Sequence, residues 1–151
     1  MADVSFDRFP RYDELTAILQ AWAAGHPDLL TVDSIGRSYE GRDIWLCTVK
    51  DSSTGPAAER PALWVDASIH ATELTGTVAA LHQLHRLLTG HGSHDKVTHA
   101  LQTRTFYVAP RINPDGAELA LADRPEQGTA VTIEARHRRA GVLRETVVLG
   151  E

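Results

Sequence analysis

The sequence contains few of the residues that characterise several large classes of protein. The 151 residues contain a single cysteine, Cys47, so the chain cannot form the internal disulfides that stabilise small secreted domains. No apolar run approaches the roughly 18 residues that a membrane-spanning helix requires. Basic residues are in deficit, 15 against 20 acidic ones, so the net charge of −5 leaves no basic field for nucleic acid. These absences predict that neither a membrane nor a nucleic acid is a partner.

Aromatic residues are scarce and unevenly placed. They make up 6% of the chain, and the last is Tyr107, so the final 44 residues have no large ring to anchor a core. Residues 1–125 carry the whole net charge, whereas residues 126–151 hold four basic and four acidic residues. We therefore predict a folded domain over residues 1–125 and a divergent tail over residues 126–151. The first 15 residues contain no apolar leader segment, which together with the single cysteine predicts a cytoplasmic location.

The remaining composition, 42% hydrophobic and 23% charged, is typical of a globular domain. Four apolar residues near the start recur every three or four positions, which predicts an amphipathic helix. These residues are Leu15, Ile18, Leu19 and Trp22. A second helix is predicted over residues 71–88. Strands are predicted over four segments rich in β-formers, which are residues 31–35, 44–50, 62–68 and 105–109.

Strands that alternate with helices favour an α/β fold. We expect a mixed, largely parallel sheet flanked by helices, with an antiparallel hairpin formed by the first two strands. Residues 62–68 form an apolar segment, which is expected to be a buried central strand. Residues 113–116, Asn-Pro-Asp-Gly, have the composition of a tight turn, and turn formation is a sufficient explanation for them.

His70 and Glu73 form the sharpest local feature, because they lie where the strand over residues 62–68 ends and the next helix begins. Ligands bind at the carboxyl ends of the strands in open α/β sheets, and imidazole with carboxylate suits Zn²⁺. The His-x-x-Glu pattern alone is weak evidence, since 8 histidines and 9 glutamates produce it by chance about half the time. A structural alternative is that Glu73 only complements the dipole at a helix N-terminus.

Two further segments accompany this pattern in a fixed order. Residues 34–45, Ser-Ile-Gly-Arg-Ser-Tyr-Glu-Gly-Arg-Asp-Ile-Trp, precede it, and residues 110–116, Pro-Arg-Ile-Asn-Pro-Asp-Gly, follow it. Residues 61–73 contain the His-x-x-Glu pattern itself. In this order and spacing the sequence resembles the M14 zinc carboxypeptidase family over residues 12–122, and specifically the N-terminal portion of its catalytic domain.

The resemblance implies a zinc metallopeptidase that removes the C-terminal residue of a peptide. His70 and Glu73 correspond to two of the three protein ligands of the zinc ion in that family. A separate glutamate serves as the general base toward a zinc-bound water, and the partner is the C-terminus of a peptide substrate.

The sequence departs from the family pattern in several places. Thr72 stands where family members commonly have an arginine that helps to hold substrate, and this departure by itself is expected to change specificity more than chemistry. The third ligand, a histidine, lies further downstream in the family than the 78 residues that follow Glu73 here. We expect the chain to be truncated and, without a third ligand and a general-base glutamate, inactive by itself. The alternatives are a non-catalytic remnant or binding module, and a related zinc deacylase of N-acyl amino acids.

Truncation also has a consequence for association. A sheet that lacks some of its strands exposes the unpaired amides and carbonyls of an edge strand, and such edges pair with other chains. We therefore expect the chain to oligomerise or aggregate through an exposed sheet edge.

Overall fold

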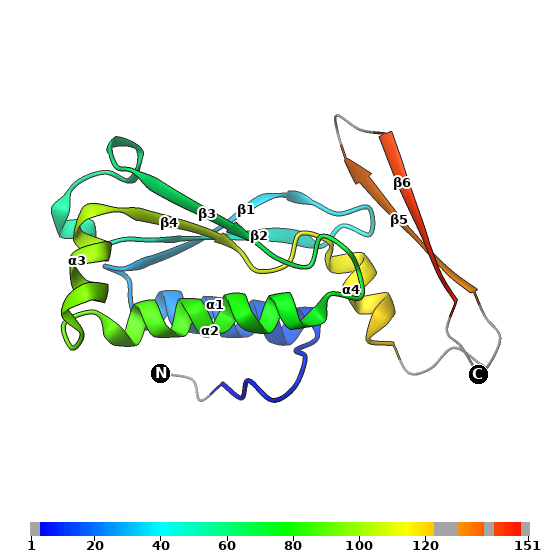
Figure 1. Ribbon diagram of the computed structural model, residues 1–151, viewed down its shortest axis with the longest axis horizontal. Helices are drawn as coiled ribbons and strands as arrows, with labels where there is room; N and C mark the ends of the chain where they lie inside the picture. Colours follow the sequence, from blue (N-terminus) through cyan, green and yellow to red (C-terminus); the bar gives the residue numbers. More distant parts are fainter. Residues whose placement is uncertain (1–3, 123–129, 138–140, 149–151) are drawn as a thin grey trace.

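The computed structural model describes residues 4–122 in full and the backbone of residues 130–137 and 141–148. Figure 1 shows a leading helix, three strands, two helices, a strand and a short helix in chain order, followed by a final pair of strands. The helices are α1 (Tyr12–Gly25), α2 (Leu74–Gly90), α3 (Asp95–Thr103) and α4 (Pro114–Ala120), with short 3-10 turns η1 (Ser52–Thr54) and η2 (Ala57–Glu59). The strands are β1 (Leu30–Arg37), β2 (Asp43–Val49), β3 (Ala62–Asp66), β4 (Thr105–Ala109), β5 (Ala130–His137) and β6 (Gly141–Val148). None of the described helices is both long and apolar enough to cross a membrane.

Four of the strands form one mixed sheet in the order β1-β2-β4-β3, and β5 and β6 form a separate antiparallel pair. The mixed α/β fold and the antiparallel β1–β2 hairpin are confirmed. The four-stranded sheet is less parallel than expected. β2 and β4 pair antiparallel, as β1 and β2 do, and β3 and β4 form its one parallel pair. The helical crossover through α2 and α3 makes that pair parallel, since it returns the chain to the end of the sheet where β3 began.

β3 is an edge strand of the four-stranded sheet, so the prediction of a buried central strand was wrong. Leu63 and Trp64 are 48% and 51% exposed, and in the described part of the chain β3 has a neighbour on one side. The composition of a strand indicates how apolar it is, whereas its position in the sheet depends on the segments that connect the strands. Here the crossover places β4 between β2 and β3.

The core lies between the sheet and the two long helices, α1 and α2, which run along one of its faces (Figure 1). Leu19 and Trp22 of α1 and Leu84 of α2 are fully buried there, so the predicted amphipathic stripe is confirmed. Cys47 of β2 lies opposite Val108 of β4, and both are fully buried. Burial raises the pKa of the Cys47 thiol to about 12, which makes it an inert core residue.

Replacing Leu84 by alanine tests this core. Leu84→Ala removes a fully buried side chain, and we expect the free energy of unfolding to fall by about 2–5 kcal/mol. Leu119→Ala is the matched control, because Leu119 is 45% exposed and its loss is expected to change stability by about 0.5 kcal/mol. Urea denaturation followed by circular dichroism measures both values. Equal effects of the two substitutions would contradict this placement of the core.

Candidate metal centre

His70 and Glu73 lie together in the turn between β3 and α2. The helix begins at Leu74 rather than at residue 71, so both residues precede its first turn. His70 Nδ1 lies 3.0 Å from Glu73 Oε1, and the two side chains are 55% and 56% exposed. The structure therefore brings the two predicted ligands within reach of one ion, at the carboxyl end of β3 and open to solvent.

Ser68 shapes the backbone of this turn. Its φ angle of 52° lies in the left-handed region, which is unfavourable for a residue with a Cβ atom and persists where surrounding contacts hold it. The Ser68 hydroxyl donates to the Glu73 carbonyl oxygen at 2.9 Å and lies 2.9 Å from the Thr77 hydroxyl. Because the single Ser68 proton is used on Glu73, Thr77 is the donor in the second contact.

A buried arginine that sequence reasoning missed extends this chain of hydrogen bonds. Arg111 is 2% exposed; its Nε donates to the Thr77 hydroxyl at 3.3 Å and one of its terminal nitrogens donates to the Pro10 carbonyl at 2.8 Å. Burial lowers the pKa of Arg111, while Glu118, 3.6 Å away, acts in the opposite direction. Arg111 thus positions Glu73 through Thr77 and Ser68.

The Asn-Pro-Asp-Gly segment begins α4 and does more than form a turn, which corrects the sequence interpretation. Asn113 accepts a hydrogen bond from the Gly116 amide at 2.9 Å as the N-cap, and Pro114 occupies the first helical position. A Cβ atom on Gly116 would lie 2.8 Å from the Ala71 Cβ and 2.6 Å from the Asn113 side-chain nitrogen. Ala71, between the two candidate ligands, is 1% exposed, so their turn packs directly on Gly116.

Asp115 joins the same segment to the loop between β1 and β2. Its carboxylate accepts hydrogen bonds from the Ser38 hydroxyl at 2.7 Å, the Glu40 amide at 2.9 Å and the Arg42 guanidinium at 2.7 Å. Burial by itself would raise the pKa of Asp115, but these three donors together outweigh it and hold that pKa below its usual value of 3.8. The first and third sequence motifs therefore meet at one carboxylate.

His70 and Glu73 fit a zinc ion in the chemistry of their donor atoms, since a ring nitrogen and a carboxylate oxygen face each other. Within the residues that the structure describes, no group of three His, Cys, Asp or Glu side chains could hold a metal ion. The described part of the chain thus offers two candidate ligands, and a catalytic zinc usually has three from the protein.

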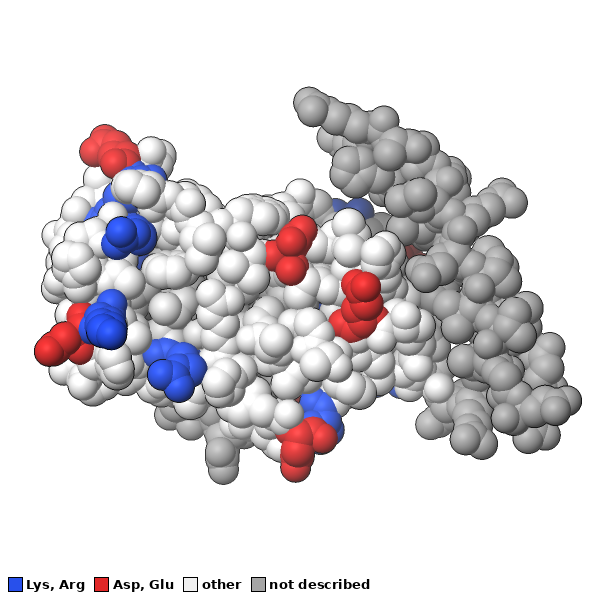
Figure 2. All heavy atoms as spheres, viewed as in Figure 1, with Lys and Arg blue, Asp and Glu red and all other residues white. Residues whose placement is uncertain are grey.

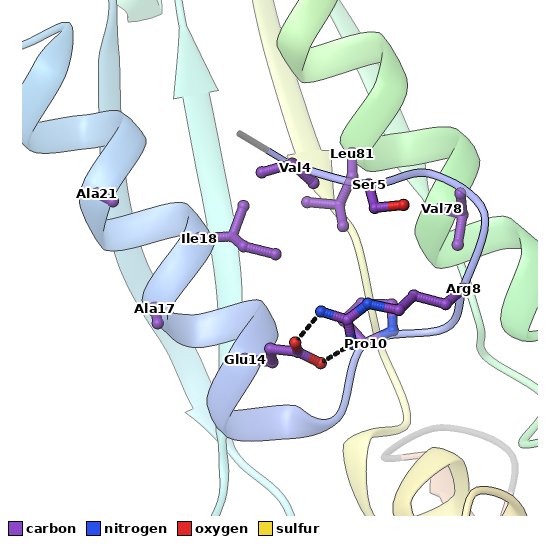
Figure 3. A pocket seen from close by; sticks show the side chains of 10 residues that line it. All are labelled: Val4, Ser5, Arg8, Pro10, Glu14, Ala17, Ile18, Ala21, Val78 and Leu81. Atoms are coloured by element: carbon purple, nitrogen blue, oxygen red, sulfur yellow. Dashed lines mark hydrogen bonds and ion pairs between the residues drawn. The ribbon is translucent and has the colours of Figure 1, made fainter. Parts of the chain in front are cut away.

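A cavity of about 330 Å³ lies elsewhere, between the N-terminal segment, α1 and α2 (Figure 3). Neither His70 nor Glu73 lines it, and its acidic residue, Glu14, is already paired with Arg8. Its lining is mostly apolar: Val4, Ser5, Arg8, Pro10, Glu14, Ala17, Ile18, Ala21, Val78 and Leu81. This cavity is therefore separate from the candidate metal centre.

Residues 15–141 match the family model described as zinc carboxypeptidase. The chain belongs to the zinc carboxypeptidase family. The resemblance seen in the three sequence motifs is thus confirmed, and with it the assignment to a family of zinc-dependent hydrolases.

This chain matches individual zinc carboxypeptidases over only a part of their length. Carboxypeptidase B of Astacus astacus is 31% identical over 112 residues, which cover 74% of this chain and 35% of that protein. A protein of Saccharomyces cerevisiae named an inactive metallocarboxypeptidase is 28% identical over 114 residues, which cover 76% of this chain and 26% of that protein. The crystal structure of carboxypeptidase A from Helicoverpa armigera matches with a TM-score of 0.70 and 26% sequence identity. The match covers 80% of this chain and 28% of that protein. The chain therefore spans about a quarter to a third of the length of these relatives.

Gly116→Ala tests the packing of the ligand turn. Alanine favours a helix over glycine, yet its Cβ would collide with Ala71 and Asn113, so we expect the free energy of unfolding to fall by about 1–3 kcal/mol. Gly25→Ala is the matched control, since the added Cβ would have no atom within 4 Å apart from its chain neighbours and the backbone of its own helix. Thermal denaturation of both variants measures the difference. A Gly116→Ala variant as stable as Gly25→Ala would show that Ala71 does not pack there.

Asp115→Asn tests the carboxylate that joins the motifs. The folded-state pKa is depressed, so the stabilisation is present above the unfolded-state pKa of about 3.8 and is lost as the pH falls through the folded value. We expect the substitution to cost about 1–3 kcal/mol at pH 7 and progressively less at acid pH. Unfolding free energies measured from pH 7 down to acid pH check this. Parallel curves for the two proteins would refute it.

Proposed function

We propose that His70 and Glu73 bind a zinc ion and that the chain forms part of a metallocarboxypeptidase whose substrate is the C-terminus of a peptide. The observation that carries this proposal is the 3.0 Å approach of His70 Nδ1 to Glu73 Oε1 within a chain of this family. A zinc ion bound there supplies Lewis acidity that polarises the scissile carbonyl. The cytoplasmic location expected from the sequence stays a prediction.

The protein's own contribution is to hold the two ligands before zinc arrives. Ser68 and Thr77 fix the backbone of Glu73, and Ala71 packs the turn on Gly116. Both ligand side chains are more than half exposed, so a peptide can approach them without any rearrangement of the core. The backbone of the turn is thus held by hydrogen bonds and packing, whereas the side chains of the two candidate ligands face solvent. This arrangement suits a metal ion that must also contact substrate.

We further propose that these 151 residues do not hydrolyse peptides by themselves. The part of the chain that the structure describes offers two candidate ligands, which alone would leave zinc weakly held, and a general base is also needed to take the proton from the attacking water. One relative is named an inactive metallocarboxypeptidase, which supports a non-catalytic role within the family. The relatives quoted above are named carboxypeptidases, which favours peptide chemistry over the deacylase alternative.

Zinc titration of the purified chain tests the proposed ligands. We expect His70→Ala and Glu73→Gln each to weaken binding by at least the roughly 10–100-fold that loss of an outer-shell partner costs. His99→Ala, which removes an exposed histidine on α3, is the matched control and should leave the affinity unchanged. Isothermal titration calorimetry reports the affinities. If His99→Ala weakens binding as much as His70→Ala does, zinc is held by scattered surface histidines and the proposal fails.

Activity is measured separately, as release of the C-terminal residue from a blocked dipeptide in the presence of zinc. No turnover is expected from the chain alone. Turnover that His70→Ala abolishes would uphold the ligand assignment and overturn the proposed inactivity.

A further inference from the structure

Ser68 occupies a backbone position that favours glycine. Its φ angle of 52° is left-handed, a conformation that glycine adopts without strain and that a Cβ atom makes costly. Among the described residues other than glycine, Ser68 alone has a positive φ angle. Its side chain is 3% exposed, so water does not satisfy the hydroxyl. The strain at this position therefore indicates that the hydroxyl has a use inside the protein.

The Ser68 hydroxyl lies in a chain of hydrogen bonds whose direction is fixed at one end. Arg111 carries only donors, so the Thr77 hydroxyl accepts from its Nε at 3.3 Å and uses its own proton on Ser68, 2.9 Å away. The Ser68 proton is then left for the Glu73 carbonyl at 2.9 Å. Thr77 is fully buried, and each bond in such a chain polarises the next. The chain therefore supplies one oriented donor to the backbone of Glu73.

The Glu73 backbone closes the ligand turn and begins the helix that follows. Its amide donates to the His70 carbonyl at 3.3 Å, and its carbonyl also accepts from the Gly76 amide at 3.0 Å. Gly76 allows the helix to approach, because a Cβ atom there would lie 3.3 Å from the Ala67 Cβ and 3.4 Å from the Ser68 nitrogen. The backbone that carries both candidate ligands is thus tied to Ser68 on one side and to α2 on the other.

The charged end of the Glu73 side chain has little to hold it. Its carboxylate is more than half exposed and contacts the His70 ring, and among the described residues no lysine or arginine forms an ion pair with it. Figure 2 shows acidic side chains in the middle of the view with no basic side chain against them. The position of the carboxylate before zinc binds therefore depends on the backbone that carries it.

We propose that Ser68 is a positioning residue of the metal centre, whose strained backbone is retained because its hydroxyl holds the His70–Glu73 turn ready for zinc. Thr77 and Arg111 act through it by fixing the direction of that hydroxyl. This inference rests on the proposed zinc site and adds that residues without contact to the metal set its affinity. Glycine at position 68 would relieve the strain and still weaken zinc binding.

Two substitutions at position 68 separate positioning from stability. Ser68→Ala keeps the strain and removes the hydroxyl, whereas Ser68→Gly removes both. We expect Ser68→Gly to melt at a higher temperature than Ser68→Ala, yet both to weaken zinc binding about tenfold, at the lower end of the effect of an outer-shell partner. Thermal denaturation and isothermal titration calorimetry of the full chain measure the two quantities. A Ser68→Gly variant that binds zinc as tightly as the wild type would overturn the proposal.

A pair of buried threonines tests the hydrogen bonds behind Ser68. Thr77→Val removes a hydroxyl at nearly constant shape and is expected to weaken zinc binding, whereas Thr77→Ser keeps the hydroxyl and should bind as the wild type does. Thr105→Val is the matched control. Thr105 is also fully buried and donates to the Ala57 carbonyl at 3.2 Å, but it lies at the start of β4, away from the ligand turn. Wild-type affinity in Thr77→Val, or equal losses in both valine variants, would contradict the positioning role.

His70→Ala, measured alongside, distinguishes this inference from the proposed function. If His70→Ala weakens zinc binding and Ser68→Gly does not, the proposed ligands stand and the role of Ser68 is overturned. If His70→Ala leaves the affinity unchanged, the zinc site itself is wrong, and the role of Ser68 fails with it.

Discussion

The close approach of the β3–α2 turn to the start of α4 is the contact on which the arrangement of the candidate site depends. Ala71 can be buried between two exposed candidate ligands because Gly116 presents no side chain to it. Asp115, the neighbour of that glycine, binds the β1–β2 loop through three donors. Segments that lie far apart in the sequence are thereby fixed to one short helix, and the position of His70 relative to Glu73 is a result of that packing.

Much of the local structure could be predicted because it depends on short-range pattern. The stripe that includes Leu19 and Trp22 identified α1, since helical periodicity alone determines which face is buried. The positions of His70 and Glu73 followed from a strand ending just before a helical pattern. The family resemblance came from the order of three motifs, and order along a chain is visible without any structure.

Features that depend on which elements become neighbours were mispredicted or missed. The composition of β3 indicated a central strand, but the crossover that places β4 inside it is a property of the whole sheet. Arg111 belongs to the third sequence motif but had no assigned role, because its burial and its contacts depend on Pro10 and Thr77, which are distant in sequence. The helix-capping role of Asn113 was the one omission that the sequence already signalled, since asparagine followed by proline is a common helix start.

The buried thiol of Cys47 makes the molecule convenient for site-specific chemistry. It is the single cysteine of the chain, and it is sealed between the sheet and the helices with a pKa of about 12. Maleimides and other alkylating reagents attack thiolates, so they will not modify the folded chain at this position. A cysteine introduced at the surface would then be the only reactive one, and a fluorophore or spin label could be attached there while the native residue stays in place.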